Sequence, residues 1–274
     1  MVINFIKKTI ENKQRNYVFI TQVLNAVIAL IAGKLIAVYI SPEDFGIYNI
    51  QFTTYTFFST LLISPFLQFL KATNTSLLTK IGSKQYLQTI VFIIILTYIL
   101  YISFLYFYYN IFSFTLLVIF LIFIFISTLN SILSDYLNIH NHIIDFSRLS
   151  IVKSVSGLIF ITLFLVLGLK FMNHVQALWM IQLIGVLVAA SFFISKYKVL
   201  KSKFKIGYPT FLKKYLRFGT PLIILAFWLW INNFFDRYAI EYFLSMKDVG
   251  IYNASYSVGS KFFLLLSPIF AVLL

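Results

Sequence analysis

The chain has 274 residues, of which 61% are hydrophobic and 11% are charged, and its formal net charge at pH 7 is +14. A soluble domain of this size needs far more polar surface to cover its core, so the composition excludes a soluble globular protein. The absence of cysteine excludes disulfides and thiolate metal sites. The basic excess could suggest nucleic acid as a partner, but we expect none, because most cations lie in loops between apolar segments.

Apolar runs of about 20 residues recur along the whole chain, and this is the length that an α-helix needs to cross the hydrocarbon of a membrane. The runs are continuously apolar rather than alternating, which argues against a β-barrel. We therefore predict an all-α, polytopic membrane helical bundle with about eight transmembrane helices. In chain order the predicted segments are residues 17–40, 46–70, 86–109, 111–133, 151–169, 175–195, 219–244 and 250–274.

The first predicted helix follows a short basic stretch, "MVINFIKKTIENKQRN", and has no small-residue cleavage pattern. It is therefore expected to be a membrane helix rather than a removable signal peptide. Lys and Arg concentrate in the loops on the N-terminal side, with only Lys170 and Lys247 in loops on the other side. This bias predicts a cytoplasmic N-terminus. The basic stretch 196–217 either anchors that face to anionic lipid or gathers an anionic substrate there.

A repeated phrase joins the first two and the last two predicted helices. "SPEDFGIYN" begins at Ser41 and "SMKDVGIYN" begins at Ser245, an offset of 204 residues. Six helices separate the copies, so both are expected on the same side of the membrane, as in a parallel two-lobe repeat. Because both copies have Ser, Asp and Gly at the same spacing, we predict the same turn in each. The Asp would cap the next helix, and the Gly would permit a tight bend.

The repeat also predicts the domain organisation. Residues 1–204 form an N-terminal six-helix transmembrane lobe, and residues 205–274 form the start of a C-terminal lobe. The chain ends within the second helix of that lobe, so we expect a C-terminally truncated sequence.

Three cations fall within predicted helices, where an ionisable group is costly unless it snorkels, pairs or faces water. Lys34 and Arg237 precede Ser41 and Ser245 by similar distances, which places them at nearly equal depth. Each either snorkels to the external headgroups or faces a shared aqueous cavity. Lys261 lies near the bilayer midplane, where snorkelling is hardest, and we expect it to face the cavity.

The predicted helix 219–244 carries the most polar stretch within the membrane. Arg237 and Glu241 are spaced i,i+4 and can pair, and Asn233 shares their face. Asp236 adds a further hydrogen-bonding group. This face is either a structural ion pair or the wall of a cavity for an anionic, hydroxyl-rich ligand.

Two histidines, His140 and His142, lie near Asp145 in the loop after the fourth predicted helix. Their i,i+2 spacing points them to different sides of a helix, and a third close ligand is lacking. We expect a solvated turn rather than a metal site.

The first helix with "SPEDFGIYN" resembles the start of bacterial polysaccharide repeat-unit flippases of the O-antigen and capsule type. The stretch "FGTPLIILAFWLWINNFFDRYAIEYFLSMKDVGIYN" is similar to this family's pattern of Gly-x-Pro, a polar Asn and Asp-Arg helix, and Gly-Ile-Tyr. The matching positions are Gly219, Pro221, Asn233, Asp236, Arg237, Gly250, Ile251 and Tyr252. The family is part of the multidrug, oligosaccharidyl-lipid and polysaccharide exporter superfamily.

The resemblance implies a two-lobe transporter in the bacterial plasma (inner) membrane, working by alternating access. Its substrate would be an undecaprenyl-diphosphate-linked oligosaccharide, moved from the cytoplasmic to the external leaflet. Ion gradients rather than ATP would drive it, with H+ or Na+ as the coupling ion, so neither a cofactor nor an enzyme activity is expected. Membrane lipid and other polysaccharide-assembly proteins are the expected partners.

A diphosphate brings negative charge that bare lipid cannot accommodate, and cations in a cavity would offset that cost. Lys34, Arg237 and Lys261, with Asn233, are therefore the substrate-binding candidates, and Asp236 and Glu241 are the ion-coupling candidates. One alternative is a multidrug or organic-cation exporter of the same superfamily, and another is a non-functional fragment. A membrane glycosyltransferase or polymerase is disfavoured, because the external loops are short and no nucleotide-binding motif is present.

Overall fold

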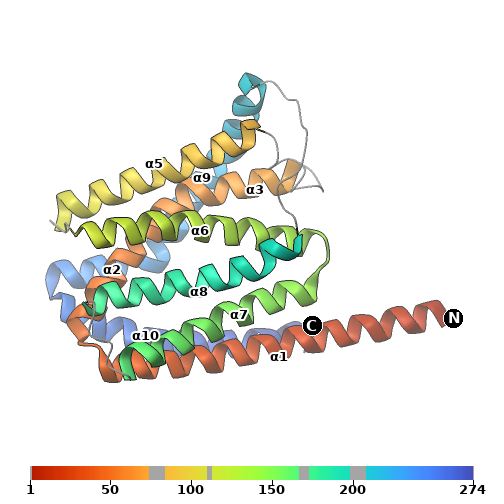
Figure 1. The fold of residues 1–274 in the computed structure, drawn as a ribbon, viewed down its shortest axis with the longest axis horizontal. Coiled ribbons are helices and arrows are strands. Elements are labelled where there is room, and N and C mark those ends of the chain that lie inside the picture. The colour runs from red at the N-terminus through yellow and green to blue at the C-terminus, as the bar shows by residue number, and fades with distance from the viewer. Residues whose placement is uncertain (1, 74–83, 110–112, 167–172, 198–207, 274) are drawn as a thin grey trace.

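The computed structural model describes the backbone of residues 2–73, 84–109, 113–166, 173–197 and 208–273 (Figure 1). Side chains are described within residues 16–72, 88–109, 113–165, 173–193 and 213–260. The elements are α1 (Val2–Tyr39), α2 (Pro42–Phe58), a π-helical turn (Ser59–Ile63), α3 (Ser64–Thr73), α5 (Lys84–Tyr109), α6 (Phe114–Ile139), α7 (Ile143–Ile161), a second π-helical turn (Thr162–Val166), α8 (His174–Tyr197), α9 (Tyr208–Phe243) and α10 (Met246–Leu273). The prediction of an all-α membrane bundle is confirmed.

Within the described residues, six helices are long and apolar enough to cross a membrane. These spans are Asn16–Tyr39, Gln88–Tyr109, Phe114–Ile139, Ile143–Leu165, His174–Phe193 and Lys213–Phe243. The predicted segment 46–70 corresponds to α2 and α3, which the first π-helical turn joins. That wide turn precedes Pro65, whose ring cannot continue a regular α-helical ladder.

The boundary between α6 and α7 differs from the prediction. We expected a loop from residue 134 to residue 150, but α6 continues to Ile139 and α7 begins at Ile143. The intervening turn is tight, and Asn141 adopts a positive φ of 56°, a conformation that Asn tolerates better than most residues. The apolar run in the sequence ends where the helix leaves the hydrocarbon of the membrane. The helices α6 and α7 continue past that point into the polar region.

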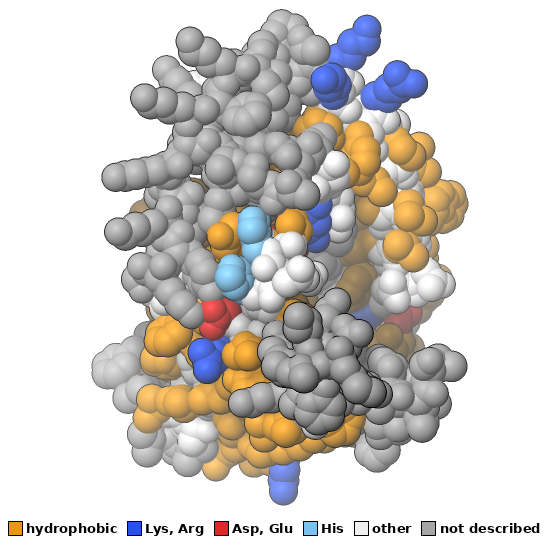
Figure 2. Space-filling model, turned by 90° about the vertical axis from the view of Figure 1, so that its right-hand side faces the viewer, with side chains coloured by type: hydrophobic (Ala, Val, Ile, Leu, Met, Phe, Trp, Pro, Cys, Tyr) orange, Lys and Arg blue, Asp and Glu red, His pale blue; other side chains and the backbone are white. Residues whose placement is uncertain are grey.

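The helices lie side by side, and their turns gather at two ends (Figure 1). The turns before α2 and α10 lie at one end, which we call the repeat end, and the N-terminus lies at the opposite end. Basic side chains project at the N-terminal end (Figure 2). Many large apolar side chains are exposed along the lengths of the helices, among them Phe92 and Trp228, as expected of surfaces that contact lipid.

Trp179 of α8 is fully buried at the centre of an aromatic cluster. The rings of Phe120 and Phe123 on α6 lie 4.8 and 5.2 Å from it, and Tyr48 on α2 lies 5.5 Å away. Its Nε1–H donates to Oε1 of Gln51 at 2.8 Å, because a buried indole needs an acceptor. This cluster locks α2, α6 and α8 together.

Each copy of the repeated phrase is capped by its serine rather than by its aspartate. Ser41 has an extended backbone, and its Oγ accepts from the backbone N–H of Asp44 at 3.1 Å. Ser245 accepts from the N–H of Asp248 at 3.3 Å in the same way. The expectation that the aspartate is the cap is wrong, because it already lies inside the helix, where its carboxylate reaches back to the serine hydroxyl.

The repeat glycines also have a different role from the one predicted, because both lie inside helices rather than in the turns. At these positions α2 and α10 meet backbone to backbone. A Cβ added to Gly46 would overlap the Met246 carbonyl oxygen and lie 2.8 Å from its carbon. A Cβ added to Gly250 would overlap the Pro42 carbonyl oxygen and lie 2.7 Å from its carbon. The two copies of the repeat therefore pack directly against each other.

Candidate functional site

A buried arginine at the contact between α9 and α10 is the centre of the first candidate site. Arg237 is only 4% exposed, and its Nε donates to Oδ1 of Asn253 at 3.1 Å. Its Nη1 donates to the backbone oxygen of Asn233 at 2.7 Å and to Oδ1 of Asp236 at 3.0 Å. These bonds compensate a charge that would be costly to bury alone.

Aromatic rings enclose the same guanidinium. Its central carbon lies 5.1 Å from the ring of Phe234 and 5.1 Å from the ring of Tyr256, distances that suit cation–π attraction. The Tyr252 hydroxyl donates to Oδ2 of Asp236. Tyr252 is in the second copy of the repeat, so this site links the polar face of α9 to the repeat. We call Asn233, Asp236, Arg237, Tyr252 and Asn253 the arginine cluster.

Glu241 does not form the ion pair with Arg237 that their i,i+4 spacing predicts. The ion pair of Arg237 is with Asp236, whereas Oε2 of Glu241 accepts from the Tyr109 hydroxyl at 3.2 Å. The Arg237 side chain reaches back toward Asn233 and across to α10, which takes it away from Glu241. Glu241 instead connects α9 to the end of α5.

Lys34 and Lys261 lie apart from the arginine cluster or outside the described side chains, and Asn233 belongs to the cluster only in part. Lys34 is exposed on α1, and it makes no ion pair with any residue that the structure describes. The backbone of Lys261 is part of α10, but its side chain lies outside the described residues. Asn233 is exposed, and its Nδ2 donates to the Leu229 oxygen at 2.7 Å. Asn233 therefore joins Asp236 and Arg237 in the cluster through its backbone oxygen, whereas its side chain is bonded elsewhere.

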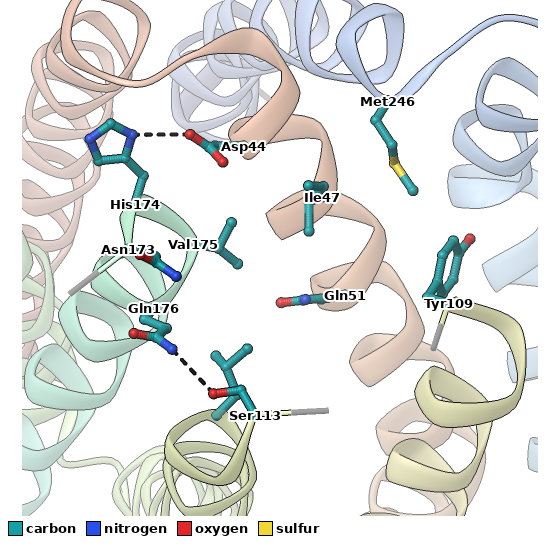
Figure 3. Close-up of a pocket in the computed structure, with 11 residues that line it drawn as sticks. Asp44, Ile47, Gln51, Tyr109, Ser113, Asn173, His174, Val175, Gln176 and Met246 are labelled. Atoms are coloured by element: carbon teal, nitrogen blue, oxygen red, sulfur yellow. Dashed lines mark hydrogen bonds and ion pairs between the residues drawn. The ribbon is translucent and has the colours of Figure 1, made fainter. Parts of the chain in front are cut away.

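A cavity of about 670 Å³ that was not among the predicted sites opens at the repeat end (Figure 3). Tyr109 and Met246 form part of its wall. Its polar lining residues are Asp44, Gln51, Ser113, Asn173, His174 and Gln176. They come from α2, α8 and the start of α6, which explains why no continuous motif marks them. We call this space the repeat-end cavity.

Hydrogen bonds hold parts of the cavity wall in place (Figure 3). Nδ1 of His174 lies 3.0 Å from Oδ2 of Asp44, and Nε2 of Gln176 donates to Oγ of Ser113 at 3.2 Å. Gln51 is 1% exposed and accepts from Trp179. The wall therefore combines a hydrogen-bonded carboxylate and imidazole with amide and hydroxyl groups.

The two histidines of the α6–α7 turn have structural contacts. Nδ1 of His140 lies 2.9 Å from the Tyr136 oxygen, and its ring lies 4.1 Å from the Tyr136 ring. In the part of the chain that the structure describes, no group of three His, Cys, Asp or Glu residues could hold a metal ion.

Comparison with known protein families shows to which family the chain belongs. The sequence profile of the family described as polysaccharide biosynthesis protein matches residues 13–274. The chain belongs to this family. No curated protein and no solved structure matches the chain.

The two candidate sites of this polysaccharide biosynthesis protein differ in how clearly the sequence marks them. The arginine cluster is visible because charged residues interrupt an apolar helix. The polar residues of the cavity are mostly uncharged, and Asp44, Ser113, Asn173, His174 and Gln176 lie at helix starts, where polar residues are ordinary. The polar run Asn173, His174 and Gln176, directly before an apolar segment, was the available hint.

Proposed function

We propose that this chain is a transporter that flips undecaprenyl-diphosphate-linked oligosaccharide from the cytoplasmic to the external leaflet of the bacterial plasma membrane. The observation that carries the proposal is the family match over residues 13–274 of an all-helical bundle. Polysaccharide made on a lipid carrier inside the cell needs such a step, because its charged and hydroxylated head cannot cross hydrocarbon unaided.

The arginine cluster supports this proposal by its chemistry. A guanidinium presents donors in a planar fork that suits phosphate oxygens, and rings around it exclude water. In the present arrangement the bonds to Asn253 and Asp236 occupy it. When α9 and α10 move relative to each other, a diphosphate can exchange with these partners, while Lys34 and Lys261 supply further positive charge along the path.

Coupling to an ion gradient is the energy source that we propose, with no cofactor and no enzyme activity. Asp236 is the stronger candidate for H+ or Na+ coupling, because its carboxylate contacts both Arg237 and Tyr252. Neutralising this carboxylate would weaken its hold on Arg237 and favour transfer of the guanidinium to a diphosphate. Glu241 accepts a hydrogen bond from Tyr109 on α5, apart from the arginine cluster, and is the weaker candidate.

The test is deletion of the gene in the cell that encodes it. Lipid-linked oligosaccharide should then accumulate in the cytoplasmic leaflet, and surface polysaccharide should be lost. Supplying the unchanged chain should restore it, whereas Arg237→Ala at equal protein level should not. Normal surface polysaccharide in the deletion strain, with no other chain supplying the activity, would rule the proposal out.

A further inference from the structure

We propose that the repeat-end cavity binds the oligosaccharide of the substrate, apart from the arginine cluster that contacts the diphosphate. This inference rests on the proposed function, because it assigns the sugar and the phosphate of one substrate to two sites. The cavity volume of about 670 Å³ lies within the range of small-molecule sites in proteins.

The polar groups of the wall match the hydroxyl groups of a sugar. Amide side chains both donate and accept hydrogen bonds, as sugar hydroxyls do, and Asn173 and Gln176 supply two of them. A third amide of the lining, Gln51, is 1% exposed and accepts from Trp179 at 2.8 Å, so it stiffens the wall rather than binding a ligand. Ser113 similarly fixes Gln176 through its Nε2, which leaves the Gln176 oxygen as an acceptor.

An aromatic ring adds an apolar surface to the same cavity. Tyr109 is part of the wall, and its hydroxyl donates to Glu241 at 3.2 Å. That bond limits the rotation of the ring. A fixed ring can pack against the apolar C–H face of a pyranose, while the neighbouring amides bind the hydroxyl groups at its edge.

The wall favours a neutral ligand, because its acidic side chain already has a partner. In the described lining, Oδ2 of Asp44 lies 3.0 Å from Nδ1 of His174. Asp44 also accepts from the Ser41 hydroxyl at 2.8 Å. This carboxylate is thus already engaged within the protein, and the wall suits hydroxyl groups better than a diphosphate or an organic cation.

The cavity is completed by the second copy of the repeat. Met246 is part of its wall, and the backbone carbonyl of the same residue meets Gly46 at the α2–α10 contact. Separation of α10 from α2 would remove this wall. Occupation of the cavity by sugar is therefore coupled to the contact between the two copies, and the coupling acts in both directions.

The test compares the binding of two lipids to the purified chain in nanodiscs. One is the lipid-linked oligosaccharide extracted from the same cells, and the other is undecaprenyl diphosphate without sugar. The unchanged chain should bind the sugar-bearing lipid more tightly. Gln176→Leu and Asn173→Ala should each weaken binding of that lipid by roughly three- to tenfold, the loss of about one hydrogen bond. Binding of the sugar-free lipid should not change.

The matched control is Gln68→Leu, because Gln68 is exposed on α3, away from the cavity. It should leave the binding of both lipids unchanged. Equal affinity of the unchanged chain for the two lipids would overturn the proposal, as would a full sugar preference in both cavity variants. Variants that bind both lipids equally poorly would also overturn it, since the effect would not depend on sugar.

A flipping measurement on the same preparations separates the two claims. If the sugar preference and its loss are seen but nothing is flipped, the site stands and the proposed function fails. If flipping is seen without a sugar preference, the function stands and the site fails.

Discussion

Gly46 and Gly250 make reciprocal contacts, each with the backbone of the other copy of the repeat. Gly46 faces the carbonyl of Met246, and Gly250 faces the carbonyl of Pro42. Met246 and Pro42 are themselves equivalent under the offset of 204 residues, so the contact is symmetric although it lies within one chain. The repeat thus joins the start of α2 to the start of α10. We interpret the arrangement in which these two helix starts touch as the closed state of the repeat end.

Substituting one glycine of this pair should open the repeat end. The methyl group in Gly46→Ala would overlap backbone atoms rather than a movable side chain, so α2 and α10 must separate. Such overpacking costs about 2 kcal/mol. The measurement is the distance between spin labels on Glu43→Cys and Lys247→Cys, two exposed positions in a chain without native cysteine. Gly46→Ala should lengthen that distance.

The control for this prediction is Gly259→Ala on the same helix as Gly250. A Cβ at Gly259 would meet no described atom within 4 Å, so the label distance should match that of the doubly labelled parent. An unchanged distance in Gly46→Ala would show that the repeat end does not depend on the glycine contact.

The arginine cluster should need the shape of the guanidinium as well as its charge. Arg237→Lys keeps the charge but cannot reach Asn253, Asn233 and Asp236 together. We expect it to lower the free energy of unfolding by about 2 kcal/mol and to impair transport. Circular dichroism during chemical unfolding in detergent would measure the stability loss. Arg217→Lys is the matched control, because Arg217 is exposed on the same helix, and a loss as large there would contradict this explanation.

A hydrogen bond between Tyr238 and Thr54 should contribute to the packing of α9 on α2. The two hydroxyl oxygens lie 2.7 Å apart, and nearby Nε1 of Trp230 donates to the Thr53 oxygen at 3.1 Å. Tyr238→Phe and Thr54→Val should each lower the free energy of unfolding by about 1 kcal/mol. In a double-mutant cycle the two losses should not add, because either change removes the same bond. Fully additive losses would show that the bond does not stabilise the protein.

Much of the fold could be predicted because membrane spans depend on local composition. The spans of α5, α8 and α9 appear as apolar runs, and the polar face around Arg237 is visible as an interruption of one of them. The turn at Asn141 lies within the predicted loop of residues 134–150 but is shorter, since α6 and α7 continue beyond their apolar parts. Hydropathy shows where the apolar part of a helix ends, and not where the helix itself ends.

Contacts between distant segments could not be predicted in the same way. The spacing of Arg237 and Glu241 suggested a pair, but the fold supplies Asn253 from α10 and gives Tyr109 to Glu241. The glycines of the repeat looked like turn residues, and only the crossing of α2 and α10 shows why a side chain cannot be accommodated. The repeat-end cavity likewise depends on neighbours brought together by packing.

The most direct test of flipping is the reconstitution of the chain in liposomes that carry fluorescent lipid-linked oligosaccharide in both leaflets. An impermeant reductant bleaches only the outer leaflet of vesicles without a flippase. With the chain present, the bleached fraction should rise toward completion, because inner-leaflet lipid is moved outward during the reaction, and Arg237→Ala should abolish this rise. A bleached fraction equal to that of protein-free vesicles would contradict the account.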